Sequence, residues 1–160
     1  MVAGNIRLAS SHDIEKLIQV RFDYFAAEEW EVSVEQYQTI KTSLRQYYTK
    51  YINIDFFAAF VEENTEIASV AFLAITHKPA NLGFPTGKIG TILNVLTYPE
   101  YRKKGYAIST MNALISEAKK QNCSYVELSA SESGKSIYKK LGFVEIVGSE
   151  RFTEMKLSLL

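Results

Sequence analysis

The sequence has few residues of the kinds that hold metals or form disulfides. Cys123 is the only cysteine, and His12 and His77 are the only histidines. A single cysteine excludes an intramolecular disulfide and a cysteine-rich metal site, and two histidines far apart in the chain do not suggest a metal centre. We therefore expect no metal. Cys123 follows a polar turn at the start of a predicted strand, so we interpret it as a small packing residue and not as a nucleophile.

An excess of charge of either sign is also lacking. The 18 basic and 18 acidic side chains cancel, whereas tight binding to nucleic acid normally shows as a basic excess. The sequence contains no run of about 20 apolar residues that could cross a membrane, and residues 1–10 lack the apolar core of a signal peptide. We expect a cytoplasmic protein that binds neither nucleic acid nor membranes. The only dense basic run is Arg102, Lys103 and Lys104.

The sequence does have enough apolar material for one folded domain. Hydrophobic residues make up 47% of the chain, so residues 1–160 are predicted to form a single domain around one core. The spacing of apolar and turn residues predicts the order β-α-α-β-β-β-α-β-α-β-β, an α+β (mixed α/β) fold. The first two predicted helices begin near Ser10 and after Ser33. Two more helices are predicted at residues 105–121 and 133–141. The predicted strands are residues 5–9, 55–61, 66–76, 89–97, 124–130, 143–147 and 152–159, with a hairpin turn at residues 62–65.

The segment after the predicted strand 89–97 has the features of a phosphate-binding loop. It reads Arg102-Lys103-Lys104-Gly105-Tyr106-Ala107 and opens a predicted helix. A helix start exposes unpaired N–H groups with partial positive charge, and glycine lets the backbone approach an anion closely. A basic run alone is more typical of a solvated turn. Because a predicted buried strand precedes this basic run, we interpret the segment as a phosphate site.

Three segments, taken in order, resemble the Gcn5-related N-acetyltransferase (GNAT) superfamily. Arg102-x-x-Gly105-x-Ala107 matches the Gln/Arg-x-x-Gly-x-Gly/Ala signature of that family. Asn94-Val95-Leu96-Thr97-x-Pro99 stands where the family has its acetyl-CoA-binding strand, and Tyr138-Lys139-Lys140-Leu141-Gly142-Phe143 is similar to its Tyr-x-x-x-Gly-Phe segment. The resemblance extends over essentially the whole chain and is most specific over residues 89–143.

The resemblance implies acetyl-CoA as co-substrate and a central, mostly antiparallel sheet, flanked by helices and splayed at the coenzyme-binding strand. In such a fold the main chain of that strand binds pantetheine, and the loop amides bind the pyrophosphate. Ser131 stands where many members carry an asparagine near pantetheine, which puts a side-chain contact there in doubt. The residues that the resemblance assigns to the coenzyme are Val95, Leu96, Thr97, Arg102, Lys103, Lys104, Gly105, Tyr106, Ala107, Ser131, Ser133 and Ser136.

The chemistry implied is transfer of an acetyl group to a primary amine by direct attack, since the coenzyme already carries an activated acyl group. Tyr138 resembles the family's proton donor to the leaving thiolate, although a tyrosine there can also simply pack against the coenzyme. Asn94 is a polar residue in an apolar strand, so it either orients the substrate or a water, or is a hydrogen-bonded structural residue. The general base stays open: the candidates are Glu100, His77, Glu28 and Glu29, or water.

The acceptor is expected to be a small-molecule amine whose identity the sequence does not disclose. The resemblance places its pocket between the first two helices and the loop between the third and fourth strands. The candidate lining residues are Arg21, Tyr24, Phe25 and Trp30, together with Phe84 in the long loop. Aromatic residues of this kind more often belong to the core than to a pocket, and the loop can instead pack against the domain or serve a homodimer contact. The competing functions are a non-catalytic acyl-CoA-binding or regulatory domain and a protein-interaction module.

Overall fold

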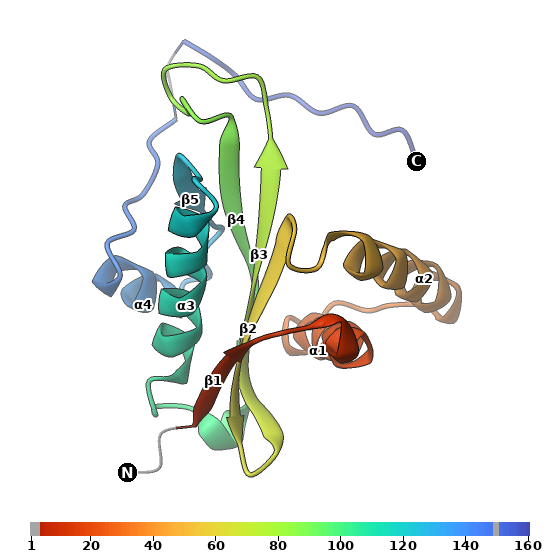
Figure 1. Cartoon of the computed structure of the whole chain (residues 1–160). Helices are drawn as coiled ribbons and strands as arrows, with labels where there is room; N and C mark the ends of the chain where they lie inside the picture. Colours follow the sequence, from red (N-terminus) through yellow and green to blue (C-terminus); the bar gives the residue numbers. More distant parts are fainter. Residues whose placement is uncertain (1–3, 149–150) are drawn as a thin grey trace. The chain divides into compact units, whose positions relative to one another are not determined.

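The computed structural model describes residues 4–148 and 151–160, shown in Figure 1. The chain forms two compact units, residues 1–129 and residues 130–160. The first unit contains the sheet and the three long helices, and the second contains one short helix, α4 (Lys135–Lys140), and irregular chain. None of the helices in the described ranges is both long and apolar enough to cross a membrane.

The first unit is built on one five-stranded sheet whose strands follow one another in chain order. β1 to β4 pair antiparallel, and β5 pairs parallel with β4. A two-residue turn joins β2 to β3, with positive φ at both Asn64 and Thr65, as a type I′ hairpin requires. The strands are β1 (Asn5–Leu8), β2 (Phe56–Glu63), β3 (Glu66–His77), β4 (Lys88–Thr97) and β5 (Tyr125–Glu127).

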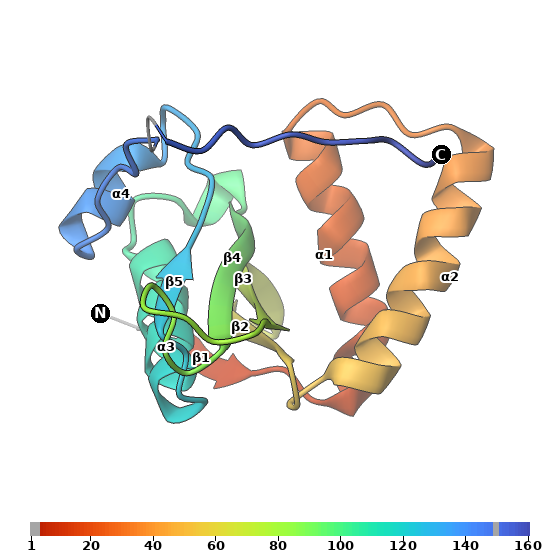
Figure 2. The ribbon, with the colours of Figure 1, turned by 90° about the horizontal axis from the view of Figure 1, so that it is seen from above.

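Helices cover both faces of this sheet, with α1 and α2 on one face and α3 on the other (Figure 2). Their bounds are α1 (Ile14–Ala27), α2 (Val34–Tyr51) and α3 (Tyr106–Lys120). Ser10 caps the 3-10 turn that leads into α1, and Ser33 caps α2; each forms a reciprocal capping box with the residue three positions later. The two helix starts predicted near Ser10 and after Ser33 are thus confirmed.

The core lies on both faces of the sheet. On the face of α1 and α2, Leu17, Tyr48 and Phe72 pack together with their neighbours in one buried cluster. On the face of α3, Val61 and Ala68 pack against Tyr106 at the first turn of the helix. α3 is therefore held against the sheet from its first residue.

The sheet opens between β4 and β5. The two strands pair only from Ile89 to Thr91, so the rest of β4 has β3 as its neighbour on one side and no β5 on the other. The β3–β4 register shifts just beyond this point, and Asn94 and Val95 together face Ala71. Asn94 has φ +55°, a left-handed conformation that asparagine tolerates better than most residues and that suits a bulge. The mostly antiparallel, splayed sheet that the resemblance implied is confirmed.

The two closing strands predicted at residues 143–147 and 152–159 are wrong: the described residues there are not in strands. Most of their apolar side chains are exposed, with Val144 at 84% and Leu157 at 83%. Alternating apolar residues favour an extended chain, but a strand also needs a partner edge, and alternation does not supply one. The strand predicted at residues 124–130 is confirmed only over Tyr125–Glu127.

Candidate functional site

No side chain caps the start of α3. Gly105 occupies the cap position, where it has no side chain to accept from the helix amides. Among the described residues, the amides of Lys103, Lys104 and Gly105 donate to no backbone acceptor, and Tyr106 and Ala107 begin the helix, where intrahelical acceptors do not exist. Lys103 and Gly105 both have positive φ, which turns successive amides toward one side. This arrangement can bind an anion.

Gly105 also leaves space in front of these amides. Its φ of +80° is in the region that favours glycine, and a Cβ at this position would meet no protein atom within 4 Å. The bulk of an anionic group can therefore approach the backbone from this side. The loop residues predicted to bind phosphate lie together, as a continuous turn from Arg102 to Ala107.

At least one of the three basic side chains of this loop is paired with a carboxylate of the protein. Nζ of Lys104 lies 2.9 Å from Oε1 of Glu63, and the Tyr106 hydroxyl donates to Oε2 of Glu63 at 2.5 Å. These two contacts lower the pKa of the Glu63 carboxyl, the tyrosine more than the lysine. Lys104 is thus paired at the β2–β3 hairpin. Glu63 anchors the first turn of α3, a role that nothing near it in the sequence indicates.

The end of β4 is also held in place by side chains. Nε of Arg102 donates to the Thr97 carbonyl at 3.2 Å, and the Ser69 hydroxyl donates to the Leu96 carbonyl at 3.2 Å. The carbonyls of two predicted pantetheine-binding residues thus already accept from protein donors. Tyr98 follows β4, and its hydroxyl donates to Asp23 of α1 at 2.5 Å. Burial and this carboxylate both raise the pKa of Tyr98.

Asn94 connects the bulge of β4 to α1. Its side chain is buried, its Nδ2 donates to the Val20 carbonyl at 3.3 Å, and its Oδ1 accepts from Nη1 of Arg21 at 3.3 Å. These hydrogen bonds satisfy the buried side chain of Asn94, as expected if Asn94 is a structural residue. They also place the guanidinium of Arg21 beside the bulge.

Of the five predicted acceptor-binding residues, the aromatic residues Tyr24, Phe25 and Trp30 lie together at the end of α1. The Phe25 and Trp30 rings are stacked with centroids 5.4 Å apart, and Tyr24 meets Trp30 edge-on at 6.0 Å. Phe25 is buried, whereas Trp30 is 55% exposed. Because Trp30 is held against two rings and still faces solvent, this cluster presents an apolar surface.

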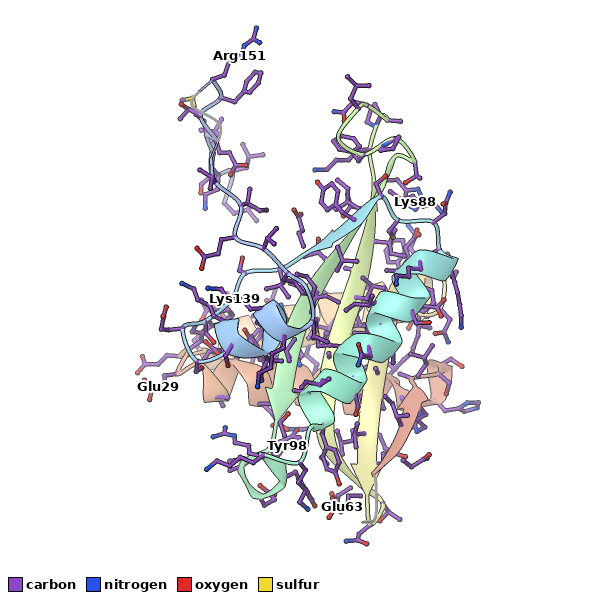
Figure 3. The ribbon with its side chains drawn as sticks, turned by 90° about the vertical axis from the view of Figure 1, so that its left-hand side faces the viewer. Glu29, Glu63, Lys88, Tyr98, Lys139 and Arg151 are labelled. Atoms are coloured by element: carbon purple, nitrogen blue, oxygen red, sulfur yellow. The ribbon has the colours of Figure 1, made fainter. Side chains whose placement is uncertain are left out.

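Phe84 does not join this cluster. It lies half-buried in the β3–β4 loop, which reaches the sheet at Lys88, and Thr86 ties the loop to Ser124 through hydroxyls 2.7 Å apart. Six residues of strand separate Lys88 from Asn94, a span of about 20 Å. Figure 3 shows Lys88 at one end of the sheet, with Tyr98 and Glu63 at the other. His77 lies opposite Lys88 and pairs with Asp55 at 2.8 Å, equally far from the bulge.

The other candidate bases are exposed. Glu28 and Glu29 follow the end of α1, and Glu100 lies in the 3-10 turn Pro99–Tyr101. Among the described residues, no three His, Cys, Asp or Glu side chains gather so that they could hold a metal ion.

In the second unit, Tyr138 belongs to a glycine-terminated helix end. The Phe143 amide donates to the Tyr138 carbonyl at 3.0 Å, and the Gly142 amide donates to the Lys139 carbonyl at 3.1 Å, with φ +94° at Gly142. This is a Schellman motif, in which a glycine takes the left-handed position and the flanking apolar residues touch. The Tyr138 and Phe143 rings accordingly meet at 6.0 Å. The Tyr-x-x-x-Gly-Phe spacing therefore has a structural reason.

The serines predicted to lie near the coenzyme surround the start of α4. Ser131 accepts from the Gly134 amide at 3.2 Å, and its hydroxyl lies 3.2 Å from that of Ser133. Ser131 thus stabilises the turn before α4, whereas Ser136 is exposed on the helix.

The family model described as the acetyltransferase (GNAT) family matches residues 17–143. The arrangement of an anion-binding helix start beside a bulged and splayed strand is thus that of an acetyltransferase. The chain belongs to the GNAT acetyltransferase family.

Solved structures agree with this assignment. A predicted acetyltransferase from Clostridium acetobutylicum, solved with acetyl-CoA, has 29% identity and a TM-score of 0.81, with 95% of each chain covered. A GCN5-related N-acetyltransferase from Ralstonia eutropha shares the fold at 20% identity, with a TM-score of 0.72 and 97% of each chain covered. Glucosamine-6-phosphate N-acetyltransferase from Arabidopsis thaliana does so at 22% identity, with a TM-score of 0.64 and 97% coverage of each. A search of curated protein sequences found no match.

Proposed function

We propose that this protein transfers an acetyl group from acetyl-CoA to the primary amine of a small-molecule acceptor. The observation that carries this proposal is the start of α3. Among the described residues its amides have no backbone acceptor, a glycine occupies the cap, and the space beside that glycine is open. In contrast, α2 begins with a side-chain capping box, and α1 continues a 3-10 turn that has one. A helix start whose amides have no acceptor suits a phosphate group.

The amides of residues 103–107 would hold the pyrophosphate of acetyl-CoA, with Lys103 and Arg102 at the entrance. The pantetheine arm would lie along residues 95–97 of β4, where β5 has separated and the strand has a free side. Ser131, Ser133 and Ser136 would contribute from the second unit. Asn94 acts here as a positioning residue, because its bonds to α1 fix the bulge that shapes this side of β4.

Acetyl-CoA supplies an activated acyl group, so the protein needs no nucleophile of its own. Consistent with this, burial raises the pKa of the Cys123 thiol and disfavours the reactive thiolate. The acceptor's neutral amine attacks the thioester directly, and Tyr138 donates a proton to the departing thiolate. A phenol suits this task because its pKa is near that of an alkyl thiol. Tyr24, Phe25 and Trp30 would contact the acceptor.

The test is release of free thiol from acetyl-CoA in the presence of a library of primary amines, with the mass of each product measured. We expect amine-dependent thiol release and a product heavier by one acetyl group. Acetyl-CoA without an amine is the control for thiol release, and coenzyme A in place of acetyl-CoA is the control for the product mass, since it lacks the acyl group. Tight binding of acetyl-CoA without turnover of any amine would instead favour a non-catalytic acyl-CoA-binding domain, and no binding would favour an interaction module.

A further inference from the structure

Arg21 is a cation on the face of α1 that packs against the sheet. Leu17, Ile18 and Phe25, which lie three or four positions away on the same helix face, are buried. Arg21 itself is partly buried between them and β4. Charged side chains are rarely placed in such surroundings unless an opposite charge accompanies them.

No opposite charge accompanies Arg21. Among the described residues, no carboxylate lies within 4.0 Å of its guanidinium, although Arg7 pairs with Asp13 and Arg45 with Glu15, each at 2.8 Å. The neighbours of Arg21 are neutral: the Asn94 amide, the Phe25 ring at 4.8 Å and the Tyr24 ring at 5.9 Å. Burial lowers the pKa of Arg21, and the groups that oppose this shift are the Tyr48 and Tyr24 hydroxyls, not a carboxylate. The site is therefore short of one negative charge.

One edge of the guanidinium is open to a ligand. Arg21 donates its recorded hydrogen bond through Nη1, to Asn94, and none through Nε or Nη2. In the described parts of the chain, every fully buried side-chain nitrogen or oxygen of a non-exposed residue has a partner. Nε and Nη2 of Arg21 are therefore not fully buried, and each keeps some contact with solvent. These two nitrogens form the edge that donates two parallel hydrogen bonds to a carboxylate.

We propose that the acceptor carries a carboxylate, which the Nε–Nη2 edge of Arg21 binds while Phe25 and Trp30 contact the acceptor's apolar part. This rests on the proposed function, because it makes the side of α1 that faces the β4 bulge the acceptor site. A carboxylate fits better than a phosphate, since one guanidinium supplies one charge and one planar edge. A phosphate carries up to two negative charges and three acceptor oxygens. The acceptor class is then amino acids and related amino carboxylates.

The kinetic test compares L-phenylalanine with L-phenylalaninamide, and other amino acids with their amides, as acceptors for the whole protein. We expect the wild type to favour the acid in each pair. Arg21→Gln should reduce that preference by about 10-fold to 100-fold, the range for a lost hydrogen-bonded charge, mainly through KM of the acid. Arg21→Lys keeps the positive charge but loses the two parallel donors. Its preference for the acid should lie between those of the wild type and of Arg21→Gln.

Arg45→Gln is the matched control, because Arg45 is an exposed arginine paired with Glu15 on the outer side of the helices. It should leave the preference unchanged. Native circular dichroism of each variant checks the fold. Equal use of acid and amide by the wild type, or a preference that survives Arg21→Gln, would overturn the carboxylate site while leaving acetyl transfer intact.

A second measurement does not depend on catalysis. Hydrocinnamate and hydrocinnamide are titrated into the ¹⁵N-labelled protein, and the Nε–H resonance of Arg21 is followed by NMR. We expect hydrocinnamate to shift this resonance in the wild type and hydrocinnamide to leave it in place. A shift with hydrocinnamate but no turnover of any amine would support the carboxylate site and count against the proposed transferase. No shift with either compound would contradict the carboxylate site.

Discussion

Replacing Tyr138 by phenylalanine should lower turnover by about 10²-fold to 10⁴-fold, the usual contribution of a general acid. The change removes only the hydroxyl, so the ring contact with Phe143 and the Schellman end of α4 are retained. The affinity for acetyl-CoA should therefore change little. Steady-state thiol release and calorimetric titration of acetyl-CoA measure the two quantities separately.

Tyr51→Phe is the control for this variant, because Tyr51 is a half-buried tyrosine at the end of α2. It should keep the turnover of the wild type. If Tyr138→Phe also keeps nearly all turnover, Tyr138 only packs, and a water must protonate the thiolate.

Replacing Gly105 by glutamate should weaken binding of acetyl-CoA by on the order of 100-fold or more, because several hydrogen bonds to a charged group are lost, each contributing about 1.5–3 kcal/mol. The new carboxylate would stand in the open space before the helix amides and repel the pyrophosphate. The fold should survive, since the side chain meets no protein atom near its Cβ. Calorimetry gives the affinity.

The positive φ of Gly105 introduces strain with any other residue, and this needs its own control. Asn122 has φ +62° just beyond the other end of α3 and is exposed, so Asn122→Glu adds the same side chain and charge to a left-handed position. It should leave the affinity unchanged. Equal losses in both variants would mean that strain in α3, and not the phosphate loop, causes the effect.

The elements that the sequence predicted well depend on residues close together in the chain. Ser10 and Ser33 cap helices through residues three positions later, and Asn64 and Thr65 make a hairpin turn by themselves. Gly105 marks the start of α3 for the same reason, because its left-handed φ is a property of one residue. Local chemistry of this kind can be read directly from a sequence.

The contacts that define the site depend on residues far apart, and the sequence did not indicate them. Arg21 meets Asn94 73 positions away, and Tyr98 meets Asp23 75 positions away. Lys104 belongs to the predicted phosphate loop, and its side chain pairs with Glu63 of the β2–β3 hairpin. The resemblance to a family located the loop and the strand, because their motifs are local. It could not tell which basic side chains are paired and which are open.

The prediction of the two closing strands was wrong for a related reason. Residues 143–147 and 152–159 have a strand-like pattern, yet pairing is a property of two segments and not of one. The length of the β3–β4 loop predicts a task for Phe84 at the acceptor site, and this stays a prediction. The structure fixes this loop through Thr86 and Ser124 at the far end of β4.

The most direct test of the central claim is an NMR titration of the ¹⁵N-labelled protein with acetyl-CoA, following the backbone amides. The account predicts that the amides of residues 103–107 show the largest shifts and become protected from exchange with solvent, because they donate to the pyrophosphate. The amides of the 3-10 turn before α1 and of the start of α2 should not respond, since each of these starts has a side-chain capping box. Shifts that spare residues 103–107 at saturating acetyl-CoA would contradict the account.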